Sequence, residues 1–141
     1  MSLAMFSRSV SELDGIVSFT AQAFTAQHID SSLRHVIDLV IEELFVNMVK
    51  YNVAATSSIS IEINGVADGV EVCMIDSDVE RFDPTAAATV DIDAPLAERT
   101  AGGLGVYLVM KMVDSISYEY KNRSSKITFS KFLESQTGSK T

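Results

Sequence analysis

Cysteine is nearly absent from this chain of 141 residues, which contains only Cys73. One cysteine excludes an internal disulfide, and together with just two histidines it argues against a structural zinc site. Cys73 lies in the apolar segment 70–75, which is typical of a buried strand residue in a reducing compartment. We therefore expect a cytoplasmic protein whose stability comes from an ordinary core.

Long apolar runs and positive charge are also scarce. No run approaches the roughly 18 apolar residues that span a bilayer, and residues 1–5 lack the basic and apolar regions of a signal peptide. The formal charge is −8, from 11 basic and 19 acidic residues. We expect neither a membrane segment nor direct nucleic-acid binding. A polyphosphate ligand would need local devices such as backbone amides, placed cations or a metal ion.

The length is that of one domain, and we expect residues 1–141 to form a single one. Its core should span about residues 5–133. Residues 1–4 are interpreted as an expression remnant before a native Met5, and residues 134–141 as a frayed polar tail. Hydrophobic residues make up 47% of the chain, enough to build a buried core.

Hydrophobic spacing predicts the order strand, helix, helix, strand, strand, loop, helix, strand, strand. Strands are expected at residues 4–9, 59–63, 70–75, 115–121 and 126–133. Helices are expected at residues 12–27, from an N-cap at Asp30 to about residue 51, and at 106–113. Residues 76–101 hold both prolines and are typical of a long functional loop. The predicted class is α+β, a two-layer sandwich with a mixed, mostly antiparallel sheet and helices on one face.

A polar stripe interrupts the apolar helix that ends near residue 51. Glu43 and Asn47 lie about one turn apart, some 40° around the helix axis, and Lys50 follows near them. An acid, an amide and a cation on one face can hold a charged ligand. A solvated, helix-stabilising surface would show the same spacing.

Two further sites place polar or glycine residues at the ends of elements. Asp76 and Asp78 follow directly on an apolar strand, where a carboxylate can accept a hydrogen bond from a ligand amine or simply cap a turn. Residues 102–105, Gly-Gly-Leu-Gly, precede the third helix. Glycines let backbone N–H groups approach an anion, and a helix N-terminus adds favourable partial charge. Flexible loops are often glycine-rich as well.

In combination, order and spacing, the three sites resemble those of the histidine-kinase-like ATPase superfamily, which includes gyrase and the ATP domains of sensor kinases. The resemblance covers roughly residues 5–133 and is greatest to small bacterial anti-sigma factors that act as serine-protein kinases. The stretch 98–112 and the segment Phe82-Asp83-Pro84 are especially similar to that subgroup. It implies a Bergerat-type ATP-binding fold with ATP and Mg²⁺ as cofactors.

The resemblance also implies roles for single residues. Glu43 matches the catalytic base, Asn47 the ligand of a phosphate-bridging Mg²⁺, and Asp76 the acceptor for the adenine amino group. The cation at the phosphates is left open among Lys50, Arg99 and Lys111. The residues expected to bind nucleotide are Asn47, Lys50, Asp76, Asp78, Phe82, Arg99, Gly102, Gly103, Leu104, Gly105 and Ser125.

Two departures from the family pattern affect the functional hypothesis. Asp78 replaces the glycine of the usual Asp-x-Gly, where a carboxylate would hinder binding of the adenine base. Ser124-Ser125 replaces the usual Gly-Thr of the last hairpin. The leading hypothesis is an ATP-dependent kinase that phosphorylates a serine of an anti-anti-sigma-type antagonist and also sequesters a sigma factor. The alternative is a non-catalytic switch, dependent on nucleotide or not, on the same fold. Members of the subgroup often dimerise, and the apolar faces here permit a homodimer without requiring one.

Overall fold

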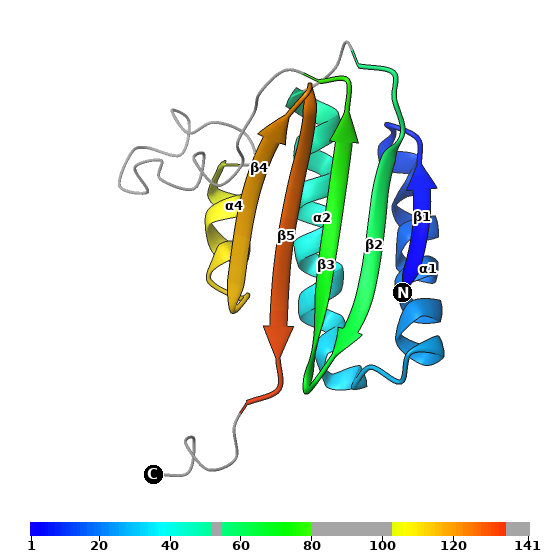
Figure 1. The fold of residues 1–141 in the computed structure, drawn as a ribbon, viewed down its shortest axis with the longest axis vertical. Helices are drawn as coiled ribbons and strands as arrows, with labels where there is room; N and C mark the ends of the chain where they lie inside the picture. Colours follow the sequence, from blue (N-terminus) through cyan, green and yellow to red (C-terminus); the bar gives the residue numbers. More distant parts are fainter. Residues whose placement is uncertain (52–54, 80–102, 135–141) are drawn as a thin grey trace.

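The computed structural model describes residues 1–51, 55–79 and 103–134, in which helices cover one face of a five-stranded sheet (Figure 1). The described helices are α1 (Leu13–Ala26), α2 (Arg34–Tyr51) and α4 (Gly103–Met110), with short 3₁₀ turns at Val10–Glu12 and Ser31–Leu33. The strands are β1 (Ser2–Phe6), β2 (Ile59–Val66), β3 (Gly69–Ser77), β4 (Ser115–Lys121) and β5 (Ser124–Phe132).

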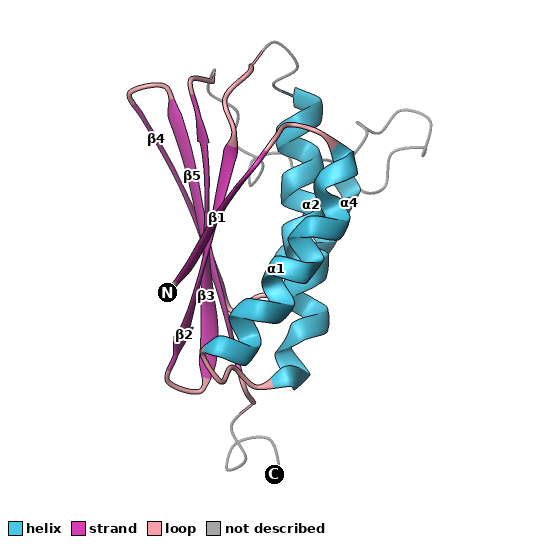
Figure 2. Ribbon diagram, turned by 90° about the vertical axis from the view of Figure 1, so that its right-hand side faces the viewer, coloured by secondary structure: helices cyan, strands magenta, loops and turns pink. Residues whose placement is uncertain are grey.

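The sheet has the strand order β1-β2-β3-β5-β4, and every neighbouring pair is antiparallel. Figure 2 shows the two layers edge-on, with the helices on one side of the sheet. The predicted α+β class, the order of elements and the single helical layer are confirmed. The central position of β3 places its last residues between β2 and β5, away from both sheet edges.

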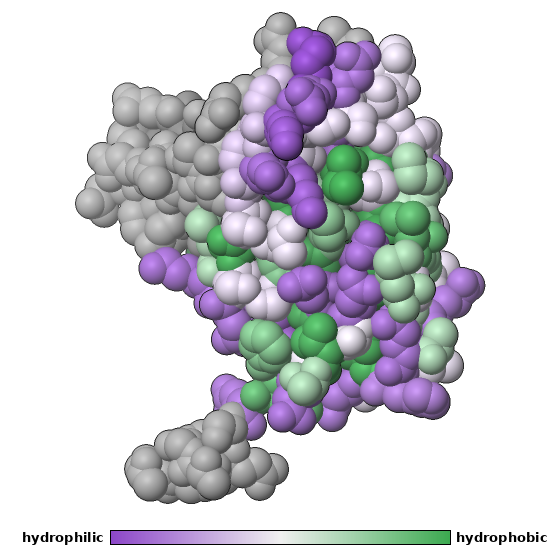
Figure 3. All heavy atoms as spheres, in the orientation of Figure 1, coloured by the Kyte–Doolittle hydropathy of each residue, from purple (hydrophilic) through white to green (hydrophobic). Residues whose placement is uncertain are grey.

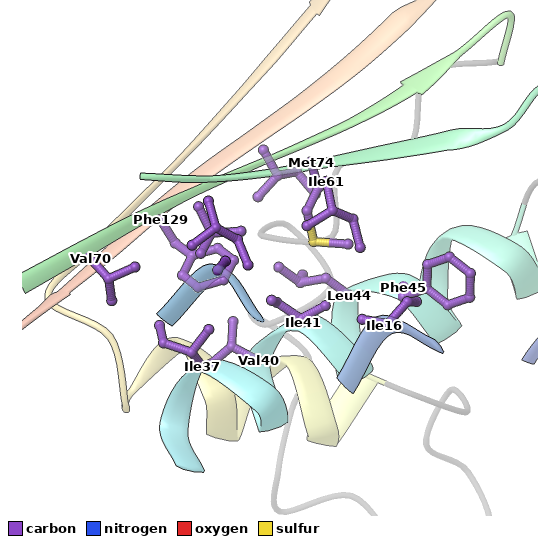
Figure 4. Packing of buried hydrophobic residues seen from close by; sticks show 14 of the residues in the cluster. Ile16, Ile37, Val40, Ile41, Leu44, Phe45, Ile61, Val70, Met74 and Phe129 are labelled. Carbon is purple, nitrogen blue, oxygen red and sulfur yellow. The ribbon is translucent and has the colours of Figure 1, made fainter. Parts of the chain in front are cut away.

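The core lies between the sheet and α2. The inward residues of β2, Ile59, Ile61 and Ile63, are fully buried because strand side chains alternate between the two faces. Facing them, α2 presents apolar residues at the spacing of one helix face, and β5 adds Phe129 (Figure 4). The buried α2 residues are Ile37, Val40, Ile41, Leu44, Phe45, Asn47 and Met48. Asn47 is the polar member of that set, which sets the position of the site.

The opposite face of the sheet is a mosaic of hydrophilic and hydrophobic residues (Figure 3). Leu3 and Met5 are exposed at the β1 edge, whereas Glu71 and Lys126 are exposed on the central strands. Cys73 is buried among them, as predicted, and its burial raises the pKa of its thiol.

The first strand, β1, begins and ends nearer the N-terminus than the predicted range 4–9. It pairs with β2 from Ser2 to Phe6, so residues expected to precede the core take part in the sheet. It ends there because the chain turns immediately: Ser7 N–H donates to the Glu12 carboxylate, and the Ser9 hydroxyl accepts from Ser11 N–H to cap the next turn. Arg8 lies in this turn.

Local capping and turn chemistry accounts for the start of α2 and for both hairpins, but not for α4. Asp30 caps the 3₁₀ turn that leads into α2, accepting from Ser32 N–H at 2.9 Å. The two hairpins turn at Asp68 (φ 58°) and at Asn122-Arg123 (φ 52° and 61°). The exception is α4, predicted at residues 106–113 but observed at Gly103–Met110. Gly103 and Gly105 were expected to precede the helix, yet they belong to it, since packing overrides weak helix propensity.

Most of the predicted loop 76–101 and the predicted tail lie outside the described residues. Among the helices that are described, none combines the length and apolar character required to cross a bilayer.

Two glycines give opposite predictions for substitution by alanine. A Cβ at Gly69 would lie 2.5 Å from Lys131 O and 3.1 Å from Phe132 Cα, both backbone atoms of β5. Gly69→Ala should therefore cost about 1–3 kcal/mol, because the strands must separate. At Gly15, exposed in α1, the nearest atom is Phe6 Cε1 at 3.9 Å. Gly15→Ala should instead stabilise the protein by about 0.5–1 kcal/mol. Urea denaturation of both variants measures this, and equal stabilities would contradict the packing described at β5.

Candidate functional site

The predicted site residues that the structure describes converge at one end of the sheet, where β3 ends, β5 begins and the last turns of α2 pass behind them (Figure 1). Asp76 on β3 is paired in register with Ser125 on β5, and the two are 0% and 5% exposed. A carboxylate and a hydroxyl thus lie side by side on the helix-covered face of the sheet, which is buried.

Asn47 and Glu43 interact along α2. The Asn47 amide nitrogen donates to the Glu43 carbonyl oxygen at 2.7 Å and lies 3.4 Å from the Glu43 carboxylate oxygen Oε2. Because only the NH₂ side of an amide can donate, Asn47 Oδ1 faces away from Glu43 and remains an acceptor. Asn47 is 2% exposed, so this part of the polar stripe is no solvated helix face.

The Glu43 carboxylate packs against the first turn of α4. A Cβ built at Gly105 would overlap it, lying 2.5 Å from Cδ and 2.6 Å from Oε2. Any larger residue at position 105 would displace the carboxylate. The glycine-rich segment and the acidic stripe, 62 positions apart in the chain, therefore form one site.

The donor set fits Mg²⁺ shared with a polyphosphate. Mg²⁺ takes oxygen ligands and usually keeps several waters and phosphate oxygens beside one or two protein groups. Asn47 Oδ1 supplies a neutral oxygen, with the Glu43 carboxylate one turn away. Within the described ranges, no cluster of three His, Cys, Asp or Glu residues could hold a metal without a ligand's help.

Sequence reasoning missed Arg8, whose guanidinium engages both oxygens of Asp76. Nη1 donates to Oδ1 in a short contact and Nη2 donates to Oδ2 at 3.2 Å. The side chains are 7% and 1% exposed, so this is a buried ion pair. No local pattern indicates it, because the partners lie 68 positions apart. The available clue was an arginine two residues after an apolar strand in an acidic chain.

Asp78 adopts a backbone conformation that glycine favours. Its φ is 54°, in the left-handed region that aspartate tolerates better than most residues. The side chain is 72% exposed and pairs with Arg123 at 3.1 Å. It is therefore directed toward the β4–β5 turn rather than toward Asp76, and the hindrance suggested by the sequence is not seen in this arrangement.

Comparison with known proteins places this geometry in a family. Residues 6–131 match the family model described as histidine kinase-like ATPase domain. The chain belongs to this family. Fourteen chains of solved structures also match. One is the histidine kinase AdeS of Acinetobacter baumannii, with a TM-score of 0.52 and 13% identity over 96% of this chain and 69% of that one. No curated protein matches the chain.

Family membership confirms the resemblance at the level of the superfamily. It supports nucleotide binding by the domain and makes ATP the expected ligand. At 13% identity the AdeS likeness concerns the fold alone. The roles of single residues, Mg²⁺, the serine-kinase activity and the anti-sigma partners remain predictions.

The remaining predicted residues of this histidine-kinase-like ATPase domain are only partly placed. Lys50 is exposed in the last turn of α2. Gly103 begins α4, followed by Leu104. Lys111 lies just beyond the opposite end of α4, roughly 9 Å along the axis from Gly105. Outside the described residues lie Phe82, Arg99 and Gly102.

A pocket of about 410 Å³ lies at the other end of the domain, between the C-terminal end of α1 and the β2–β3 turn. His28 and Asp68 line it, both with positive φ. His28 lies two residues after the end of α1. No predicted site residue lines this pocket, so the candidate nucleotide site stays at the Asp76 end.

Asn47→Asp tests the buried amide without any ligand. The new carboxylate would be buried beside that of Glu43 and would face the Glu43 carbonyl oxygen, to which the amide now donates, so we expect a loss of roughly 2–4 kcal/mol at pH 7. The loss should shrink in acid, because protonation removes the buried charge and restores an O–H donor. Urea denaturation at two pH values measures both effects.

The matched control is Asn64→Asp. Asn64 also donates to a carboxylate, Glu62 Oε2 at 2.8 Å, but it is half-exposed on β2. Its substitution should cost less than about 1 kcal/mol. Equal losses at both positions would contradict a special environment at Asn47.

Proposed function

We propose that this domain binds ATP with Mg²⁺ and transfers the γ-phosphate to a serine hydroxyl of a partner protein. The observation that carries the proposal is the Glu43–Asn47 pair, in which a buried amide keeps its oxygen available beside a carboxylate that packs on Gly105. This arrangement brings a base, a metal ligand and a helix N-terminus to one place, as phosphoryl transfer requires.

Each end of the site would bind one part of the nucleotide. Asp76 accepts a hydrogen bond from the adenine amino group, with the Ser125 hydroxyl beside it in register. Gly103 to Gly105 offer backbone N–H groups at the start of α4, where the helix dipole favours an anion. Asn47 Oδ1 would be the protein ligand of Mg²⁺, and the ion would supply positive charge to the transferring phosphate.

In the chemical step, Glu43 takes the proton from the serine hydroxyl while the serine oxygen attacks the γ-phosphorus. The bond between the γ-phosphorus and the bridging oxygen of the β-phosphate breaks, and ADP leaves. The contact with Gly105 limits where the carboxylate can lie. Positioning of the reactants provides most of the remaining acceleration. The candidates for the cation at the phosphates are Lys50, Arg99 and Lys111.

The similarity of residues 82–84 and 98–112 to the anti-sigma kinases favours an anti-anti-sigma-type antagonist as the substrate and a sigma factor as a second partner. A switch without catalysis is the alternative. The sequence feature that favoured the switch was Asp78, whose side chain pairs with Arg123 at the rim. The kinase is therefore the stronger hypothesis.

Glu43→Gln separates the two functions. The amide preserves the size of the side chain but cannot accept the proton, so ATP binding should stay near wild type. Phosphate transfer should fall about 10²-fold, the lower end of the range for a positioned base, because loose phosphoryl-transfer transition states need little base assistance. Calorimetry measures binding, and a radiolabelled γ-phosphate followed onto a cognate antagonist measures transfer.

The neighbouring Glu42→Gln is the control, since Glu42 is exposed and lies on a different helix face. It should leave both quantities unchanged. Tight ATP binding by the wild type without any phosphorylated antagonist would contradict the kinase and favour the switch. Absence of ATP binding would overturn the nucleotide site itself.

Asp78→Gly tests whether the replaced glycine matters. Because the Asp78 side chain is exposed and directed to Arg123, its removal should change ATP affinity by less than about 2-fold, the scale of a surface ion pair. Calorimetry of the two proteins at equal ionic strength measures the difference. A markedly tighter complex in Asp78→Gly would mean that the carboxylate does reach the adenine.

A further inference from the structure

The negative charge of the buried Asp76 carboxylate cannot be neutralised by adenine. Its side chain is 1% exposed at the end of a central strand. A buried carboxylate is costly unless a cation and hydrogen-bond donors compensate it. The 6-amino group of adenine is a neutral donor, so it can satisfy a lone pair but not the charge. The cation that does so is Arg8, contributed by the turn after β1.

The Arg8 guanidinium donates four hydrogen bonds. Besides both Asp76 oxygens, Nη1 donates to the Ser57 carbonyl at 3.5 Å and Nη2 to the Met48 carbonyl at 2.8 Å. These contacts use all four hydrogens on the two terminal nitrogens. Arg8 is therefore committed to protein acceptors and is not placed to bind a phosphate.

The same contacts join the two ends of the site. Met48 directly follows Asn47 in the last turns of α2, where the helix dipole favours a cation. One planar group thus connects the helix that carries Asn47 to the strand that carries Asp76. The planar guanidinium fixes both the orientation of the Asp76 carboxylate and its distance from α2. A lysine ammonium, which acts as a point charge, could not fix both.

We propose that Arg8 is a positioning residue for nucleobase selectivity: it orients the Asp76 carboxylate toward the amino group of adenine. This inference rests on the proposed ATP binding. An ionised carboxylate can accept about four hydrogen bonds, which is more than the two that Arg8 donates. Arg8 acts through Asp76 and makes no contact with the nucleotide.

Selectivity is measured with two nucleotides, ATP and purine riboside 5′-triphosphate, which carries hydrogen in place of the 6-amino group. The wild type should prefer ATP by roughly 10- to 100-fold, the value of a hydrogen bond to a charged group. Arg8→Lys keeps the charge but loses the fork, so the preference should fall below about 3-fold. The affinity for purine riboside triphosphate should stay the same, because the phosphate end is untouched.

Arg34→Lys is the matched control. Arg34 also forms an ion pair, with Asp38 at 3.0 Å, but the two side chains are 29% and 28% exposed and lie at the other end of α2. The same chemical change there should leave the ATP preference unaltered. The ratio of the two affinities is the decisive quantity, because a purely structural role of Arg8 would lower stability without altering the ratio.

A stability cycle tests the pair without nucleotide. Arg8→Met should lower Tm by roughly 10 °C, since it leaves the Asp76 carboxylate buried without the guanidinium. The double variant Arg8→Met/Asp76→Asn should regain part of that loss, because removing both charges costs less than removing one. Additive losses would overturn the buried pair on which the proposal stands.

The outcomes separate this inference from the proposed function. Failure of the wild type to bind either nucleotide overturns ATP binding and the selectivity role with it. Equal binding of the two nucleotides by the wild type leaves the phosphate site intact but overturns recognition through Asp76. Strong ATP preference in both the wild type and Arg8→Lys overturns the role of Arg8 alone. Loss of preference in Arg8→Lys, with Arg34→Lys unchanged, is the expected result.

Discussion

The buried ion pair between Arg8 and Asp76 is the interaction on which the candidate site depends. The last residues of β3 lie between two strands and beneath α2, where an uncompensated carboxylate would destabilise the fold. Arg8 neutralises it and at the same time ties β1, α2 and β3 together. The group proposed to recognise the base is thus also part of the structural core, which limits the changes that either residue can tolerate.

Helix α2 combines two tasks that usually conflict. Its apolar face fills the core, and Asn47 interrupts that face with a buried amide. The amide is tolerated because its nitrogen is satisfied by the carbonyl of Glu43, within the same helix. Its oxygen is then left for a ligand. Because Gly105 has no side chain, α4 approaches α2 closely and its first turn contacts the Glu43 carboxylate, one helical turn from Asn47.

Substitutions at the rim of the site are absorbed more easily than substitutions in its interior. Asp78 adopts a left-handed conformation and directs its side chain to Arg123, so the chain departs from the family's glycine without filling the space beside Asp76. Asn47, Asp76 and Ser125 have no such freedom, since all are buried. The physical difference is solvent: an exposed carboxylate is hydrated in any orientation, whereas a buried one requires a specific partner.

Local pattern in the sequence determined the order of elements, the inward isoleucines of β2, the turns at Asp68 and Asn122, and the proximity of Glu43 to Asn47. Each of these depends on residues within a few positions of one another, where helical and strand periods or turn preferences act directly. Tertiary structure alone decided that α4 begins at Gly103 and that Arg8 pairs with Asp76, 68 positions away. Those outcomes depend on which surfaces meet, and charge or glycine content does not specify a distant partner until packing has brought the strand ends together.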